Sequence, residues 1–156
     1  MTARPVLDAA LFLERLADEI ERSRRYERPF SLVMLRSPAS LEAGDQARLL
    51  EWGAAAARTH VRACDCVALF EAEGMVILLL PETTAAGSRS VQERFRVLDQ
   101  LAARFGDPSA GSGHGPTATW ESEVFAYLEA PAVIEAFLQR RLGLIGQDGA
   151  PAPNQP

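Results

Sequence analysis

Residues 62–83 read RACDCVALFEAEGMVILLLPET, and this stretch decides the fold. Two apolar runs, Asp65 to Phe70 and Met75 to Leu80, flank the short acidic segment EAEG at 71–74. Two β-prone runs joined by a few turn residues that include a glycine are typical of a β-hairpin. The stretch therefore predicts two adjacent strands of a sheet.

Helices and further strands lie on both sides of this hairpin in the sequence. Apolar residues recur at helical spacing in four segments, the first of which has Asp8 as its expected N-cap. The predicted helices are 8–26, 44–60, 84–104 and 132–142, and the further predicted strands are 30–35, 117–121 and 124–128. This order predicts the fold class α/β (α+β), with a central, mostly antiparallel mixed sheet flanked by helices. We expect one domain over residues 1–145 and a disordered tail over 146–156, which holds too little apolar surface to order itself.

Composition excludes several classes of protein. The chain has 156 residues and a net charge of −5, and all 16 of its basic residues are arginine. A nonspecific nucleic-acid binder needs a basic face to neutralise phosphates, so nucleic acid is not an expected partner. No apolar run approaches the length of a membrane span, and the amphipathic N-terminus does not read as a secretion signal. These features predict a cytoplasmic protein without direct membrane insertion.

The two cysteines, Cys64 and Cys66, are expected to be buried strand residues that behave as small hydrophobes. Their spacing is too short for an unstrained disulfide bond. A metal site would need further ligands, and only His60 and His114 are candidates to join them. We therefore expect neither a metal ion nor another cofactor.

Three segments carry a resemblance to the bacterial GGDEF (diguanylate cyclase) family. Residues 12–35 resemble the opening helix and first strand of that family, and Gly44-Asp45 followed by Leu49 resembles the start of its next helix. Residues 62–83 resemble the stretch that carries its RxxD motif, its GGDEF hairpin and the strand that follows. The resemblance covers about two thirds of the chain. It implies a GGDEF or nucleotidyl-cyclase-like fold and a place in bacterial signalling.

The same segments depart from the family where its chemistry takes place. An active member makes cyclic di-GMP from two GTP molecules, and carboxylates on the first strand and the hairpin hold the metal. Here the first strand ends with Arg36, which would repel a metal ion. The hairpin motif is degenerate and reads Glu71, Ala72, Glu73, Gly74, Met75. We therefore expect no enzymatic activity and assign no catalytic residue and no metal ligand.

One motif of the family survives, since Arg62 and Asp65 match RxxD. The resemblance implies that this site binds cyclic di-GMP, because arginine can pair with guanine O6 and N7 while aspartate accepts from the guanine donors. A second arginine would complete the site, and Arg58, Arg89 and Arg94 are the candidates. The alternative is a local ion pair at a helix-to-strand junction. A receptor of this kind predicts that Arg62→Ala abolishes binding and leaves the melting temperature nearly unchanged.

Two functions follow from these observations. The first is a catalytically inactive protein-interaction or regulatory module, with a protein partner in a signalling or assembly complex and with a homodimer as one form of association. The second is a cyclic di-GMP receptor that works through Arg62 and Asp65. A candidate contact surface for the first function lies at the end of the first helix and consists of Arg22, Arg24, Arg25 and Arg28. An enzyme of another kind finds no support, because the chain contains no nucleophile triad or phosphate loop in a suitable context.

Overall fold

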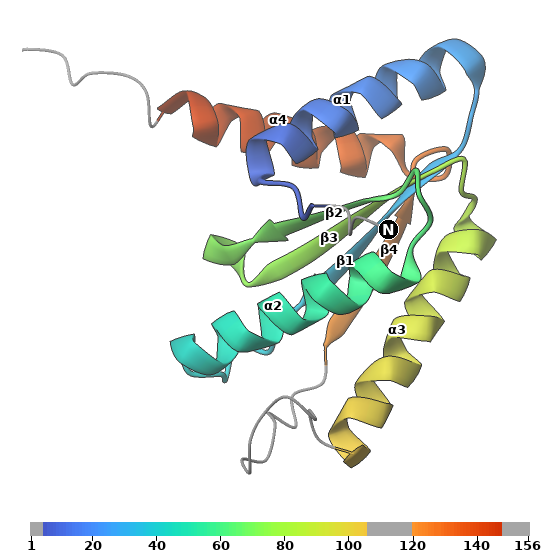
Figure 1. Cartoon of the computed structure of the whole chain (residues 1–156). Helices are drawn as coiled ribbons and strands as arrows, with labels where there is room; N and C mark the ends of the chain where they lie inside the picture. The colour runs from blue at the N-terminus through green and yellow to red at the C-terminus, as the bar shows by residue number, and fades with distance from the viewer. Residues whose placement is uncertain (1–4, 106–119, 148–156) are drawn as a thin grey trace, which may run out of the picture.

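The computed structural model describes residues 5–105 and 120–147, which form helices on both sides of one sheet (Figure 1). In chain order the elements are α1 (Ala9–Tyr26), β1 (Phe30–Arg36), α2 (Ala43–His60), β2 (Cys66–Phe70), the 3-10 turn η1 (Glu71–Glu73), β3 (Met75–Pro81), α3 (Ala85–Phe105), β4 (Glu121–Ala126) and α4 (Pro131–Gln147). The helices and strands predicted between residues 8 and 105 begin and end within two residues of these bounds. The hairpin predicted at residues 65–80 is confirmed.

The sheet has four strands in the order β2-β3-β1-β4, and every neighbouring pair is antiparallel. The strand β3 lies between β1 and β2, which is the split β-α-β arrangement. The predicted fold class, α+β with a mostly antiparallel sheet, is confirmed. The parallel component is one isolated bridge, in which Leu7 precedes α1 and pairs with Ala68 at the outer edge of β2.

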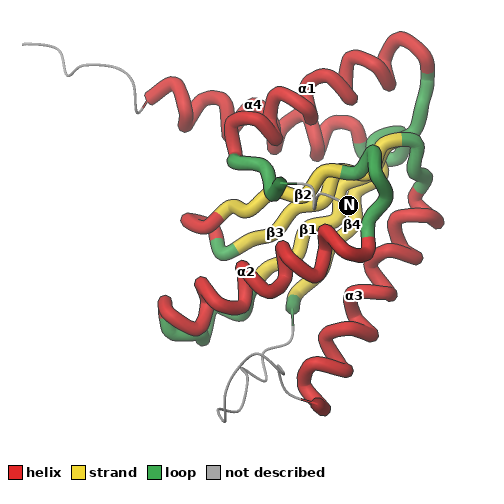
Figure 2. Tube along the Cα trace, in the orientation of Figure 1, coloured by secondary structure: helices red, strands yellow, loops and turns green. Residues whose placement is uncertain are grey.

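Two helices cover each face of the sheet (Figures 1 and 2). Successive strand side chains point to opposite faces, so Leu32 and Met34 of β1 join the core under α1 and α4. Val33 and Leu35 of the same strand join the core under α2 and α3. Both faces are covered, and this explains why β1 and β3 read as continuous apolar runs.

The first helix begins where the sequence predicts it. The Asp8 carboxylate accepts a hydrogen bond of 2.8 Å from the backbone N–H of Leu11, which is the contact expected of an N-cap. The helix ends at Glu27, which adopts a left-handed conformation with φ of 52°. Leu7, just before the cap, donates to the carbonyl of Val67 at 2.8 Å, so the start of α1 is fixed against β2.

The C-terminal part differs from the prediction. One strand, β4, takes the place of the two strands expected over 117–121 and 124–128, although residues 117–119 lie outside the described range. The strand prediction for 124–128 is wrong at its end, because the N–H groups of Glu129 and Ala130 both donate to the carbonyl of Ala126 and form a turn. The helix α4 continues to Gln147, two residues into the segment expected as tail. Residues 148–156 and His114 lie outside the described residues.

The cysteines also differ from the prediction that both are buried in a strand. Cys64 is exposed in the turn before β2, and Cys66 is partly buried as the first residue of that strand. No disulfide bond joins the two residues. Within the described ranges, no helix has the length and apolar character needed to cross a bilayer.

Candidate functional site

The hairpin between β2 and β3 closes through the turn η1. Gly74 follows this turn with φ of 61°, a left-handed conformation that favours glycine, and its N–H donates to the carbonyl of Glu71 at 3.0 Å. Glu71, Ala72 and Glu73 form the turn, and Met75 is the fully buried first residue of β3. The first four residues of the degenerate motif therefore form the loop that joins the two strands, and Met75 begins the second strand.

The end of β1 packs against this loop. The backbone N–H and hydroxyl of Ser37 both donate to the carbonyl of Gly74, at 2.9 and 3.0 Å. The side-chain amide of Gln46 donates to the Ser37 hydroxyl at 2.9 Å. A Cβ atom at Gly74 would lie 2.3 Å from Gln46 Nε2 and 2.7 Å from Ser37 Oγ. The side chains of Ser37 and Gln46 therefore occupy the space next to Gly74.

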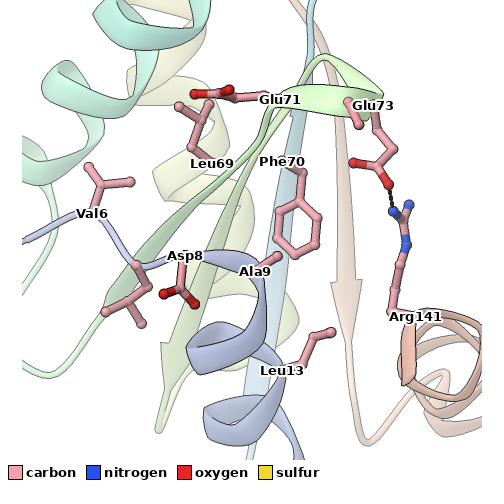
Figure 3. Close-up of a pocket in the computed structure, with 11 residues that line it drawn as sticks. Val6, Asp8, Ala9, Leu13, Leu69, Phe70, Glu71, Glu73 and Arg141 are labelled. Atoms are coloured by element: carbon pink, nitrogen blue, oxygen red, sulfur yellow. Dashed lines mark ion pairs between the residues drawn. The ribbon is translucent and has the colours of Figure 1, made fainter. Parts of the chain in front are cut away.

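Charge at this end of the sheet comes from two arginines and the hairpin acids. Arg36 pairs in register with Met75 of β3 on one side and with Glu121 of β4 on the other. The guanidinium of Arg141, on α4, forms an ion pair with the Glu73 carboxylate (Figure 3). Burial and the nearby charge of Arg36 lower the pKa of Arg141. The Glu73 carboxylate is thus already neutralised by a residue of the same chain.

The aromatic rings of the hairpin and α4 hold Arg141 in place. Its guanidinium carbon lies 5.6 Å from the ring centre of Phe70 and 5.2 Å from that of Phe137, distances at which a cation attracts the face of an aromatic ring. Phe70, Phe137 and Arg141 therefore form one contact between β2 and α4.

A groove of about 550 Å³ lies beside the hairpin (Figure 3). Its apolar wall comes from the segment before α1, from α1 itself and from the end of β2, and consists of Val6, Leu7, Ala9, Leu13, Leu69 and Phe70. Its charged groups are Asp8, Glu71, Glu73 and Arg141. Asp8 caps α1 and Glu73 pairs with Arg141. Glu71 is the acid of this groove whose side-chain carboxylate has no hydrogen bond or ion pair with the described residues. Across those residues, no three His, Cys, Asp or Glu side chains are placed to hold a metal ion together.

The structure brings Arg62 and Asp65 together, as the RxxD motif predicts. The Asp65 carboxylate accepts three hydrogen bonds from Arg62, from its backbone N–H at 2.7 Å, from Nη2 at 3.0 Å and from Nε at 3.4 Å. The Asp65 side chain is 3% exposed and that of Arg62 is 55% exposed. Hydrogen bonding to Asp65 raises the pKa of Arg62. The pair closes the turn that joins α2 to β2.

Arg62 also joins this turn to the end of β3. Its Nη2 donates to the carbonyl of Pro81 at 2.8 Å and to the hydroxyl of Thr83 at 2.7 Å. The Thr83 hydroxyl in turn donates to the Pro81 carbonyl, and the Ser31 hydroxyl donates to the Thr83 carbonyl, both at 2.9 Å. The RxxD residues thus belong to a hydrogen-bond network that connects three segments of the chain. The sequence gives no sign of the contacts to Pro81 and Thr83.

Two cavities lie next to this network, between the end of α2 and α3. One of about 310 Å³ is lined by Arg62, Asp65, Arg94 and His60 among others. The other, of about 620 Å³, is lined by His60, Arg89, Ser90, Glu93, Arg94 and Val97. Of the three candidate second arginines, Arg94 therefore shares a cavity with Arg62, and Arg89 lines the other cavity. Neither cavity includes Arg58, whose Nε is buried and has no hydrogen-bond partner among the described residues.

Comparisons with known proteins identify the architecture. No protein-family model and no curated protein matches the chain. The diguanylate cyclase SiaD of Pseudomonas aeruginosa, solved in complex with its activator SiaC, superposes with a TM-score of 0.66 over 92% of this chain at 23% sequence identity. The chain has the fold of a GGDEF domain. It covers 56% of the SiaD chain, a little over half of its length.

A second GGDEF structure agrees. The GGDEF domain of YfiN (TpbB), also from P. aeruginosa, matches with a TM-score of 0.59 and 18% identity over 92% of both chains. The GGDEF-like fold expected from residues 12–35, 44–49 and 62–83 is therefore confirmed. Identities this low show a shared fold, and the site itself must be argued from the residues of this chain.

Proposed function

We propose that this chain is a catalytically inactive module with the GGDEF fold, which acts in bacterial signalling in the cytoplasm by binding another protein. The observation that carries the proposal is the state of the hairpin end. Glu73 is paired with Arg141, and Arg36 stands where the family resemblance implies a metal-binding carboxylate.

The chemistry of a diguanylate cyclase explains why these contacts matter. Phosphoryl transfer depends on positioning the phosphates and on neutralising their charge with divalent metal. An arginine at the end of β1 repels a cation at the place where carboxylates should bind it. The contacts of Ser37 with Gly74 and of Gln46 with Ser37 fill the space next to the hairpin glycine. These features together support an inactive site.

The intact hydrophobic cores support a function in binding another protein. Both cores are complete on either face of the sheet, so a stable scaffold has been kept without the groups that catalysis needs. SiaD, which shares the fold, was solved in complex with an activator protein. The arginine cluster at the end of α1 is a weaker candidate for the contact surface than the sequence predicts. Each of its members lies within 4.0 Å of a carboxylate of the same chain, as the pairs Arg22–Glu19, Arg24–Glu21, Arg24–Glu135, Arg25–Glu21 and Arg28–Glu82 show.

Purified protein incubated with GTP and Mg²⁺ or Mn²⁺ is expected to form no cyclic di-GMP. The reason is that Arg36 and the paired Glu73 cannot assemble a metal site at the hairpin. Chromatography of the nucleotides would measure the product, with a GGDEF protein that has an intact motif as the positive control. Metal-dependent product that disappears in Glu73→Gln would show that the hairpin is active, and would refute the proposal.

A second candidate function is a cyclic di-GMP receptor, and the cavity lined by Arg62 and Arg94 favours it. The 55% exposure of the Arg62 side chain leaves part of the guanidinium accessible to a ligand. The Asp65 carboxylate is less suited to accept from a guanine, because both of its oxygens already accept hydrogen bonds from Arg62. This candidate therefore depends on the arginines more than on Asp65.

The receptor function predicts that cyclic di-GMP binds with micromolar affinity and that Arg94→Ala abolishes the binding. Arg94 is exposed and has no ion pair among the described residues, so its removal should leave the melting temperature unchanged. Isothermal titration calorimetry with wild type and variant would measure the affinity. Equal binding by both proteins would exclude this cavity, and absence of heat with folded wild type would exclude the receptor function.

A further inference from the structure

We infer that the groove between the end of α2 and α3 binds an acidic segment of a partner protein. This α2–α3 groove is the cavity lined by His60, Arg89, Ser90, Glu93, Arg94 and Val97. The inference rests on the proposed function, a protein-binding module, and identifies the surface and the chemistry of the partner. It requires neither nucleotide nor metal.

The acid of the groove itself is already neutralised within the chain, and Arg89 also lines a second cavity that contains Glu123 and Glu129. Both carboxylate oxygens of Glu93 accept hydrogen bonds from Arg96. Oε1 accepts from Nη2, and Oε2 accepts from Nε at 2.9 Å. In the adjoining cavity, Asp65 is paired with Arg62, and Glu82 with Arg28 at 2.9 Å. Hydrogen bonding to Arg96 lowers the pKa of Glu93. No carboxylate of the walls is left over to balance another arginine.

The arginines of the groove are, in contrast, unpaired. Among the described residues, no carboxylate oxygen lies within 4.0 Å of Arg89 or Arg94, whereas Arg22, Arg24, Arg28, Arg48, Arg62, Arg96 and Arg141 all have such a partner. The residues that line the groove thus carry a formal charge of +1, with two arginines against Glu93, on a chain whose net charge is −5. Complementary potentials favour and orient association, so the occupant should be acidic.

The shape of the groove suits a peptide segment. Arg89, Glu93 and Val97 are spaced by four residues on α3 and therefore lie along one face of the helix. This row extends for about 12 Å at 1.5 Å per helical residue, which matches about two turns of a partner helix or about four residues of an extended strand. Val97 is an exposed aliphatic residue at 44%. A segment that places carboxylates at Arg89 and Arg94 and an aliphatic side chain against Val97 would complement the two arginines and the exposed valine of the groove.

The test uses the full chain, labelled with ¹⁵N, and two defined peptides of 12 residues. One peptide is built from Glu, Leu and Ala with both ends blocked, and the other carries Lys in place of Glu. We expect the acidic peptide to shift the amide resonances of His60 and residues 89–97, and the lysine peptide to leave them unchanged. The variant R89E/R94E should weaken the binding of the acidic peptide by about tenfold or more, since it replaces attraction by repulsion at two sites.

The matched control is R15E/R48E, which changes the net charge equally but alters exposed arginines outside the groove. Its affinity for the acidic peptide should stay within about twofold of wild type, because distant surface charges are screened by salt.

Shifts located elsewhere, equal shifts with the lysine peptide, or equal weakening in both variants would overturn the inference. Shifts at the same amides with cyclic di-GMP and none with the acidic peptide would also overturn it, as would a self-association that occupies the groove and excludes the peptide. The GTP assay is independent of the peptide titration. Formation of cyclic di-GMP would refute the inactive module and would not affect the result with the peptides.

Discussion

Replacing Phe70 with alanine is expected to lower the free energy of unfolding by about 4 kcal/mol, in the range found for large-to-small changes of buried aromatic residues. Phe70 is 4% exposed at the end of β2, and its ring meets that of Phe12 edge-on at 5.7 Å. It also contacts Phe137 at 6.3 Å and lies under the guanidinium of Arg141. Its removal would leave a cavity where the hairpin, α1 and α4 meet. Urea unfolding followed by tryptophan fluorescence would measure the loss.

Two controls separate this packing effect from a general intolerance of substitution. Phe70→Leu keeps most of the apolar volume and should cost about 1.5 kcal/mol or less. Tyr26→Ala removes an aromatic ring that is 67% exposed and should cause no measurable change. A cost for Phe70→Ala below about 1 kcal/mol would show that the ring does not connect the hairpin to the helices, because even a partly collapsed site should cost more.

Replacing Asp65 with alanine is expected to cost about 3 kcal/mol, because it removes three hydrogen bonds to a buried carboxylate and leaves partly buried donors without an acceptor. The backbone N–H of Arg62 loses its acceptor, and the guanidinium keeps only Pro81 and Thr83. The melting temperature and the urea midpoint would both report the loss. Asp65→Asn preserves the shape and one acceptor oxygen, so it should cost clearly less than the alanine variant.

The matched control for this pair is Glu93→Ala, which breaks an exposed ion pair with Arg96 on α3. Exposed pairs contribute little, so this variant should unfold like the wild type. If Asp65→Ala were as stable as Glu93→Ala, the RxxD pair would have no structural role here, and its retention would favour the ligand-binding function. Because Arg62 makes hydrogen bonds to Asp65, Pro81 and Thr83, we now expect Arg62→Ala to lower the melting temperature as well, and Arg94 is the better residue for the ligand test.

Much of the fold could be predicted because most of the strands are visible in the sequence as short runs of apolar, β-prone residues. The run at 75–80 is apolar throughout and the run at 30–35 is apolar except for Ser31, because both faces of the central strands are covered by helices. The end of β4 could not be predicted in the same way. Tyr127 is β-prone, yet it leaves the strand, stacks on Phe30 with ring centres 4.7 Å apart and donates a hydrogen bond to Glu135. The strand ends where Glu129 and Ala130 donate to the carbonyl of Ala126, and the pattern of apolar residues does not show this turn.

The candidate site could be located from the sequence, but its internal contacts could not. The degenerate hairpin and the RxxD pair are visible as motifs, and the structure places them at the loop and the junction expected. The pairing of Glu73 with Arg141 links residues far apart in the chain, and so do the contacts of Arg62 with Pro81 and Thr83. The unpaired state of Arg89 and Arg94 depends equally on where every acid of the fold finds its partner. The sequence shows how many charged residues the chain has, whereas the structure shows which of them form ion pairs.

The position of β1 at the centre of the sheet has a consequence for the order of folding. Both of its neighbours come later in the chain, and Ser31 pairs with Ala126, a contact that closes a loop of roughly ninety residues. The β2–β3 hairpin closes through only a few residues and can form early, while pairing of β1 with β4 must wait for the long loop. We therefore expect β4 to join the sheet after the rate-limiting step, so that damage to β4 speeds unfolding and leaves the folding rate nearly unaltered.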